Sequence, residues 1–228
     1  MPAKIINIAD HRQPETEAQG FYVPREAARL ARLPQSTITY WGNQGIIVPT
    51  LTWTNEEGKE RDGYSLTDVV YMRLVAILRK RHKMREVVDA LVYLTDRIGP
   101  PGPNWGNAVV FSSGRDVWAD FRDSHWDLTS VTRKGQRAWP EFFSPEFRQL
   151  QERADALLVP EAYARHVQVD PGVRNGSPIV RDTTITTGLI RALRLQGSTI
   201  VDIADSYPVL NQTKVRQADQ FERFLDAA

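Results

Sequence analysis

Residues 21–45 read FYVPREAARLARLPQSTITYWGNQG, and this stretch decides the fold of the N-terminal part of the chain. Pro24 suits the first turn of a helix, because the N–H that it lacks would have no partner there. Apolar residues then recur at helical spacing until Pro34, which must interrupt the helix. Ser36 and Thr37 are candidate caps of a second short helix. Two short helices about a tight turn predict a helix-turn-helix.

A β-hairpin is predicted directly after this pair, over residues 46–64. Residues 46–48 open it, and Leu51 and Trp53 continue it in alternation with polar residues. Residues 55–58 read NEEG and have the composition of a turn, and residues 59–64 form the returning strand. Lys59 and Arg61 lie close to this turn. Polar side chains on a rigid helix can read base edges, and cations bind phosphate, so the ordered set predicts a DNA-binding surface.

Two more helical segments follow the hairpin. Ser65 or Thr67 can cap the first, which has a broad apolar face up to residue 78, and the second runs over residues 86–98. Five lysine and arginine residues lie between them, within residues 79–85. They form either a patch that contacts phosphate or the solvated end of a helix.

The sequence changes character after the proline- and glycine-rich residues 99–103. A β-rich region is predicted over residues 99–143, which contain four of the six tryptophans. These rings either line an effector pocket or fill a small β core. A helical pattern over residues 144–166 then predicts a linker helix that Pro160 ends. The β-like runs are residues 108–111, 116–121, 127–131 and 137–143.

The last part of the chain predicts a compact module of three helices. Gly197 ends the first helix, Ser198 can cap the second, and Thr213 can cap the third after the break at Pro208. These signals are self-contained, so a fragment that starts near residue 160 is expected to be stable by itself.

The patterns together predict a fold that is mainly α with small β parts, an α+β class. In chain order, the expected units are an N-terminal arm or tail over 1–20, a winged helix-turn-helix over 21–98, the β-rich region over 99–143, the linker helix over 144–166 and the C-terminal module over 167–228.

Composition excludes several classes of protein. The chain has 228 residues, a formal net charge of +1 and no cysteine, which excludes disulfide scaffolds, thiolate metal sites and cysteine nucleophiles. No apolar run reaches the ~20 residues of a membrane span, and no signal peptide is visible, so we expect a cytoplasmic protein. The four histidines lack ligand spacing, and no phosphate loop or dinucleotide motif is present. We therefore expect no metal, no cofactor, no catalytic residue and no enzymatic activity.

The N-terminal unit resembles the DNA-binding domain of MerR-type regulators. The resemblance rests on residues 22–28 (YVPREAA), 36–41 (STITYW), 45–49 (GIIVP) and 64–69 (YSLTDV). It implies a winged helix-turn-helix that binds double-stranded DNA as a homodimer, although Thr39 stands where the family usually has arginine. The candidate DNA-binding residues are Arg25, Gln35, Ser36, Thr37, Thr39, Tyr40, Lys59, Arg61 and Tyr64.

The C-terminal module resembles a domain found in VapB-type antitoxins. The matching positions are 170–171, 176–180, 183–185, 197–198, 203–204, 207–210 and 215. Asp182 and Thr184 depart from that pattern, where the family has glycine and arginine. The resemblance implies a partner that is a PIN-like ribonuclease toxin. The tail cations are Arg174, Arg181, Arg191, Arg194, Lys214 and Arg216, and we take Arg191, Arg194, Lys214 and Arg216 as the candidates for toxin binding.

Two functions remain open at this point. The first is an antitoxin of a type II toxin–antitoxin pair, which neutralises its ribonuclease toxin and regulates its own operon by binding operator DNA. The second is a stand-alone MerR-like transcriptional regulator with a small-molecule effector site in the central β region. An architectural protein that bends DNA is a further rival. A ribonuclease gene next to this one would favour the antitoxin.

Overall fold

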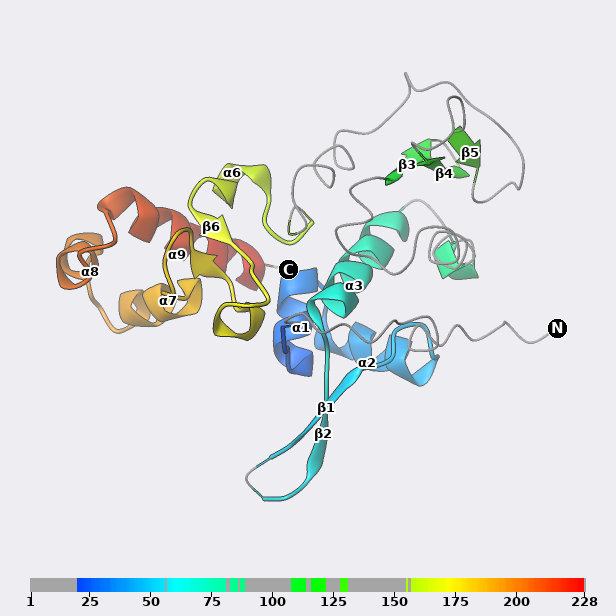
Figure 1. Cartoon of the computed structure of the whole chain (residues 1–228), viewed down its shortest axis with the longest axis horizontal. Coiled ribbons are helices and arrows are strands. Elements are labelled where there is room, and N and C mark those ends of the chain that lie inside the picture. Colours follow the sequence, from blue (N-terminus) through cyan, green and yellow to red (C-terminus); the bar gives the residue numbers. More distant parts are fainter. Residues whose placement is uncertain are drawn as a thin grey trace.

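The chain has an α+β fold, as the sequence predicts (Figure 1). A computed structural model describes residues 20–55, 57–80, 83–85, 87–88, 155 and 157–227, together with the backbone of three central strands. Residues 1–19 of the predicted N-terminal arm, most of the predicted helix over 86–98, the fourth β-like run and the first half of the predicted linker helix lie outside the described residues.

The predicted helix-turn-helix is present as α1 (Pro24–Ala31) and α2 (Gln35–Asn43). Pro24 occupies the first turn of α1, and Arg32 ends α1 in the left-handed conformation with φ of 55°. Pro34, not Ser36 or Thr37, is the N-cap of α2, and no side chain caps this helix. The extended backbone of Pro34 starts the helix early enough to put both hydroxyl residues inside its first turn, which corrects the predicted capping.

The predicted wing is an antiparallel hairpin of β1 (Leu51–Thr54) and β2 (Glu60–Gly63), with Leu51 opposite Gly63. At its tip, the Asn55 side chain accepts hydrogen bonds from the backbone N–H groups of Glu57 (3.2 Å) and Lys59 (2.8 Å). Gly58 supplies the positive φ of 75° that the turn needs. The segment 46–48, predicted to open the hairpin, precedes the strand and contributes a buried residue, Ile47.

Helix α3 (Leu66–Leu78) follows the wing and confirms the predicted apolar helix. Ser65 and Asp68 form a reciprocal capping box at its start, so Ser65 rather than Thr67 is the cap. Farther along, β3 (Ala108–Ser113), β4 (Asp116–Phe121) and β5 (Leu128–Ser130) form a three-stranded antiparallel sheet in the order β3-β4-β5. This sheet confirms the first three β-like runs.

The tail contains the predicted three helices, α7 (Thr187–Leu195), α8 (Ile200–Ser206) and α9 (Gln212–Asp226). The caps of α8 and α9 are Thr199 and Asn211, which corrects the predicted Ser198 and Thr213. Pro160 does not end a helix, because it is the N-cap of α6 (Glu161–Ala164). The remaining tail elements are the paired strands β6 (Val167–Gln168) and β7 (Ile179–Val180) and the 3-10 turn Arg174–Gly176.

One hydrophobic core joins the N-terminal helices to the tail. Buried residues of α1 and α3 belong to the same cluster as Leu158, Val167, Phe221 and Leu225. The C-terminal half of α9 accordingly lies beside α1 (Figure 1). A smaller cluster, which includes Ile190, fills the space among α7, α8 and α9. A cut near residue 160 would therefore cross the main core, contrary to the picture of two self-contained modules.

Candidate nucleic-acid interface

Helix α2 presents a polar face that is held by two buried side chains. Ile38 and Trp41 are buried in the main core and fix the orientation of the helix. The opposite face is solvent-exposed, and Tyr40 is 58% exposed although it is aromatic. The Thr39 hydroxyl donates a 3.2 Å hydrogen bond to the backbone carbonyl of Gln35, so its lone pairs remain available to an outside donor. The exposed residues of this face are Gln35, Ser36, Thr39 and Tyr40.

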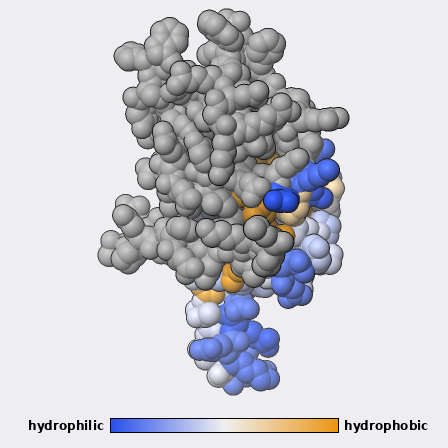
Figure 2. Space-filling model, turned by 90° about the vertical axis from the view of Figure 1, so that its right-hand side faces the viewer, coloured by the Kyte–Doolittle hydropathy of each residue, from blue (hydrophilic) through white to orange (hydrophobic). Residues whose placement is uncertain are grey.

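The hairpin projects from the head at the lower edge of Figure 1, and this projection has a mostly hydrophilic surface in Figure 2. Arg61 is exposed and lies opposite Trp53 in the register. Since successive side chains of a strand point to opposite faces, Arg61 is on the other face from Glu60 and Asp62. Lys59 is also exposed, and its 3.2 Å ion pair with exposed Glu57 is of the weak surface kind. Strand alternation therefore separates Arg61 from the carboxylates of Glu60 and Asp62, whereas Lys59 at the turn is paired with Glu57.

The base of the wing is fixed by Phe21 and Tyr22, which lie just before the N-cap residue of α1. The Phe21 ring packs edge-on against Trp53 with centroids 4.9 Å apart, and it covers Gly63, where any Cβ would overlap the ring. Tyr22 and Tyr64 exchange two backbone hydrogen bonds of 2.9 Å. These contacts determine the direction in which the wing projects.

The structure corrects one of the predicted DNA-binding residues. Tyr64 is only 4% exposed, and burial raises the pKa of its phenol to about 12. It belongs to the core beneath the wing, and its side chain is closed to DNA. Thr37 is half-buried, whereas Arg25 is exposed in the first turn of α1. The remaining candidates lie on α2 and on the wing.

Three of the four candidate toxin-binding cations are engaged within the chain. Arg191 forms an ion pair of 3.1 Å with Asp219, and Arg194 donates a 2.5 Å hydrogen bond to the carbonyl of Ser198. The Lys214 ammonium lies 3.4 Å from the carbonyl of Arg181. Arg216 is exposed on α9, and its side chain makes no recorded hydrogen bond or ion pair with the residues that the structure describes.

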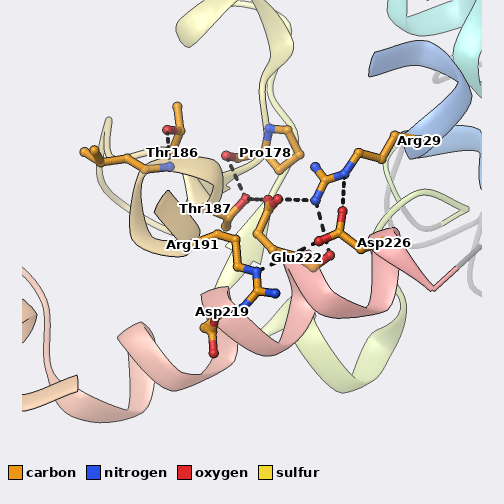
Figure 3. A network of polar contacts seen from close by, with 9 residues as sticks. Arg29, Pro178, Thr186, Thr187, Arg191, Asp219, Glu222 and Asp226 are labelled. Carbon is orange, nitrogen blue, oxygen red and sulfur yellow. Dashed lines mark hydrogen bonds and ion pairs between the residues drawn. The ribbon is translucent and has the colours of Figure 1, made fainter. Parts of the chain in front are cut away.

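A polar network that the sequence analysis missed connects α1 to α9 (Figure 3). Arg29 donates hydrogen bonds to the carboxylates of Glu222 (2.5 Å) and Asp226 (2.8 Å), and the Thr187 hydroxyl donates to the other oxygen of Glu222. Burial disfavours the charged form of Arg29, but Asp226 and Glu222 outweigh it and raise the pKa of the guanidinium. The spacing of Asp219, Glu222 and Asp226, which puts three carboxylates on one helix face, was the available signal.

Two further observations bear on other kinds of site. Within the described residues, no group of three or more His, Cys, Asp or Glu side chains is placed to hold a metal ion. In the same part of the chain, no helix is both long and apolar enough to cross a membrane.

Comparisons with known proteins find a family model that matches part of the tail and a solved structure with a similar fold. Residues 167–221 match the family described as "Protein of unknown function (DUF433)". The structure is similar to the crystal structure of Rv2018 from Mycobacterium tuberculosis, with a TM-score of 0.56 and 17% sequence identity, covering 86% of this chain and 96% of that one. At this identity the likeness concerns the fold alone. No curated protein sequence matches the chain.

Proposed function

We propose that the chain is a DNA-binding regulator whose winged helix-turn-helix reads operator DNA. The observation that carries this proposal is the exposed polar face of α2 next to a wing that exposes Arg61 on the strand face away from Glu60 and Asp62. A helix of this kind fits the major groove, where hydroxyl and amide groups pair with base edges. No side chain caps the N-terminus of α2. The Thr37 N–H donates to the carbonyl of Pro34 at 2.9 Å, and the N–H groups of Gln35 and Ser36 are the ones that could bind a phosphate.

A gel-shift assay on the DNA upstream of the gene tests this function. We expect Tyr40→Ala and Arg61→Ala each to weaken binding by about 1–3 kcal/mol, and Arg61→Ala also to lower the salt slope by about 1. Arg165→Ala is the matched control, because Arg165 is an exposed arginine of the tail outside α9. Unchanged affinity in both head variants would rule out this surface.

The proposal extends to an antitoxin of a type II pair that acts as a homodimer and neutralises a PIN-like ribonuclease. Its support is the antitoxin resemblance of the tail, together with apolar side chains that the tail leaves in solvent. Leu195 of α7 is 71% exposed, and Leu189, Val201 and Val209 are also exposed. Contiguous exposed apolar patches mark protein-binding surfaces, and the proposal takes these four side chains as the surface that meets the nuclease.

Co-expression with an adjacent ribonuclease gene product tests this second step. Leu195→Glu should abolish capture of the nuclease and leave DNA affinity unchanged. Gln196→Glu, which adds the same charge at the next exposed position, is the control. Full neutralisation by Leu195→Glu would move the toxin site elsewhere. The alternative regulator with an effector site concerns side chains of the central region outside the described residues, and it stays a prediction.

A further inference from the structure

We propose that α9 is a second DNA-reading helix, so that the chain contacts its operator through the tail as well as through the head. This inference rests on the proposed DNA binding of the head. It concerns a separate surface, formed by the N-terminal half of α9, and it assigns Arg216 to a base or phosphate of DNA.

The starts of α2 and α9 match position by position. The first seven residues of α2 read QSTITYW (35–41), and those of α9 read QTKVRQA (212–218). In both helices the first two residues are exposed, the third is half-buried, the fourth and seventh are buried, and the fifth is exposed. The fourth residues, Ile38 and Val215, are 1% and 0% exposed. Both helices therefore anchor by the same positions and present a Gln and a hydroxyl residue at the same places.

Helix α9 is packed against two other helices of the tail. Helix α8, a short connection and α9 repeat the helix-turn-helix arrangement of α1 and α2, and α7 packs against α9 as a third helix. The connection is closed by a 2.8 Å hydrogen bond from the N–H of Leu210 to the carbonyl of Tyr207. Leu210, Ile203 and Val215 share one buried cluster, which holds the two helices at a fixed angle.

The exposed face of the N-terminal half of α9 carries side chains that can pair with bases. Gln212, Thr213, Arg216 and Gln220 are exposed over the first three turns of α9. Arginine pairs with guanine and glutamine with adenine in the major groove. The carboxylate in this stretch, Asp219, is buried and forms ion pairs with Arg191 (3.1 Å) and Arg223 (2.9 Å). No exposed carboxylate of this stretch therefore opposes the approach of phosphate.

The C-terminal half of α9 connects this surface to the head. Phe221 and Leu225 are buried in the main core with α1, and Glu222 binds Arg29 across the same junction. The two reading helices therefore belong to one structural unit. A footprint longer than a single winged helix-turn-helix covers is the expected consequence.

The test uses the full-length protein in gel-shift and hydroxyl-radical footprinting assays. Arg216→Ala should weaken operator binding by about 5- to 150-fold and lose protection over a segment different from the one that Tyr40→Ala loses. Arg165→Ala is the control, and thermal melting establishes that every variant is folded. A variant Arg216→Lys should recover part of the affinity, because it keeps the charge.

Each outcome separates the two proposals. If Tyr40→Ala weakens binding and Arg216→Ala matches the control, the second reading helix is overturned and the function of the head stands. If only Arg216→Ala weakens binding, the proposed head surface fails and α9 carries the affinity. If Arg216→Ala releases the ribonuclease and leaves DNA affinity unchanged, the face is a protein-binding surface and the inference is overturned. Absence of operator binding by the unaltered protein overturns both.

Discussion

The phenolic hydroxyl of Tyr22 donates a 2.6 Å hydrogen bond to the backbone carbonyl of Gly176, which lies 154 positions farther along the chain. The neighbouring Phe21 N–H donates to the carbonyl of Asn175 at 2.8 Å. The same two aromatic residues fix the base of the wing through Trp53 and Tyr64. A loop of the tail therefore supports the segment that positions the wing hairpin of the head.

Removal of the Tyr22 hydroxyl should destabilise the protein. Tyr22 is buried, so Tyr22→Phe leaves the Gly176 carbonyl without this donor and should lower the free energy of unfolding by about 1–2 kcal/mol. Tyr40→Phe is the control, because the Tyr40 side chain is exposed. Urea denaturation measures both, and an equal effect of the two variants would contradict a role for the buried hydrogen bond.

A methyl group added at Gly176 should lower the free energy of unfolding more than one added at a glycine with no neighbouring atoms around the Cβ position. Gly176 has φ of 85°, and a Cβ there would overlap the Tyr22 hydroxyl. Gly58 has φ of 75° with nothing within 4 Å of a Cβ, so Gly58→Ala isolates the backbone strain of about 1–2 kcal/mol. Gly176→Ala should lose about 1–3 kcal/mol more. Equal losses in chemical denaturation would show that the tail loop moves away without cost.

In the network around Arg29, buried Glu222 should contribute more to the free energy of unfolding than exposed Asp226. Glu222 is buried, and its loss leaves Arg29 and Thr187 without their shared carboxylate. Glu222→Ala should cost about 2–3 kcal/mol, below the full value for a buried pair because Arg29 keeps Asp226. Asp226→Ala should cost less than about 1 kcal/mol, since Asp226 is exposed. Calorimetric melting of both variants decides the order.

The stability contributed by Asp202 should disappear on acidification. Hydrogen bonds from the hydroxyl and the backbone N–H of Thr199 lower the pKa of Asp202 below its ordinary value of 3.8. A carboxyl with a depressed pKa in the folded state stabilises it above the unfolded pKa, and this contribution is lost as pH falls through the folded pKa. Asp202→Asn should therefore lower the melting temperature near neutral pH, with the deficit closing below about pH 4. Asp205→Asn, on the exposed side of α8, is the control.

Homodimerisation remains a prediction from the MerR-type resemblance. A two-fold dimer would match a palindromic operator, because each half-site would meet an equivalent helix. Light scattering at micromolar concentration should give about twice the chain mass of 25.9 kDa. A monomer that still binds the operator would contradict the expectation.

Local signals were sufficient for most elements of the fold. Pro24 starts α1, Ser65 caps α3, and the turn at 55–58 lies where its residues place it. In each case the residue that sets the local backbone conformation lies within a few positions of the segment that it affects. The predicted caps of α2, α8 and α9 were misplaced by one to three residues. Neighbouring residues such as Ser198 and Thr199 both suit a cap, and the backbone conformation decides between them.

Contacts between distant segments required the tertiary structure. Tyr64 and Arg191 look like binding residues in the sequence, yet one is buried and the other pairs with Asp219. The junction of head and tail rests on partners such as Arg29 and Glu222, which are 193 positions apart. Hydrophobic periodicity reveals which face of a helix is buried. It does not reveal which apolar face of another element packs against that face. That choice depends on the packing of the whole chain.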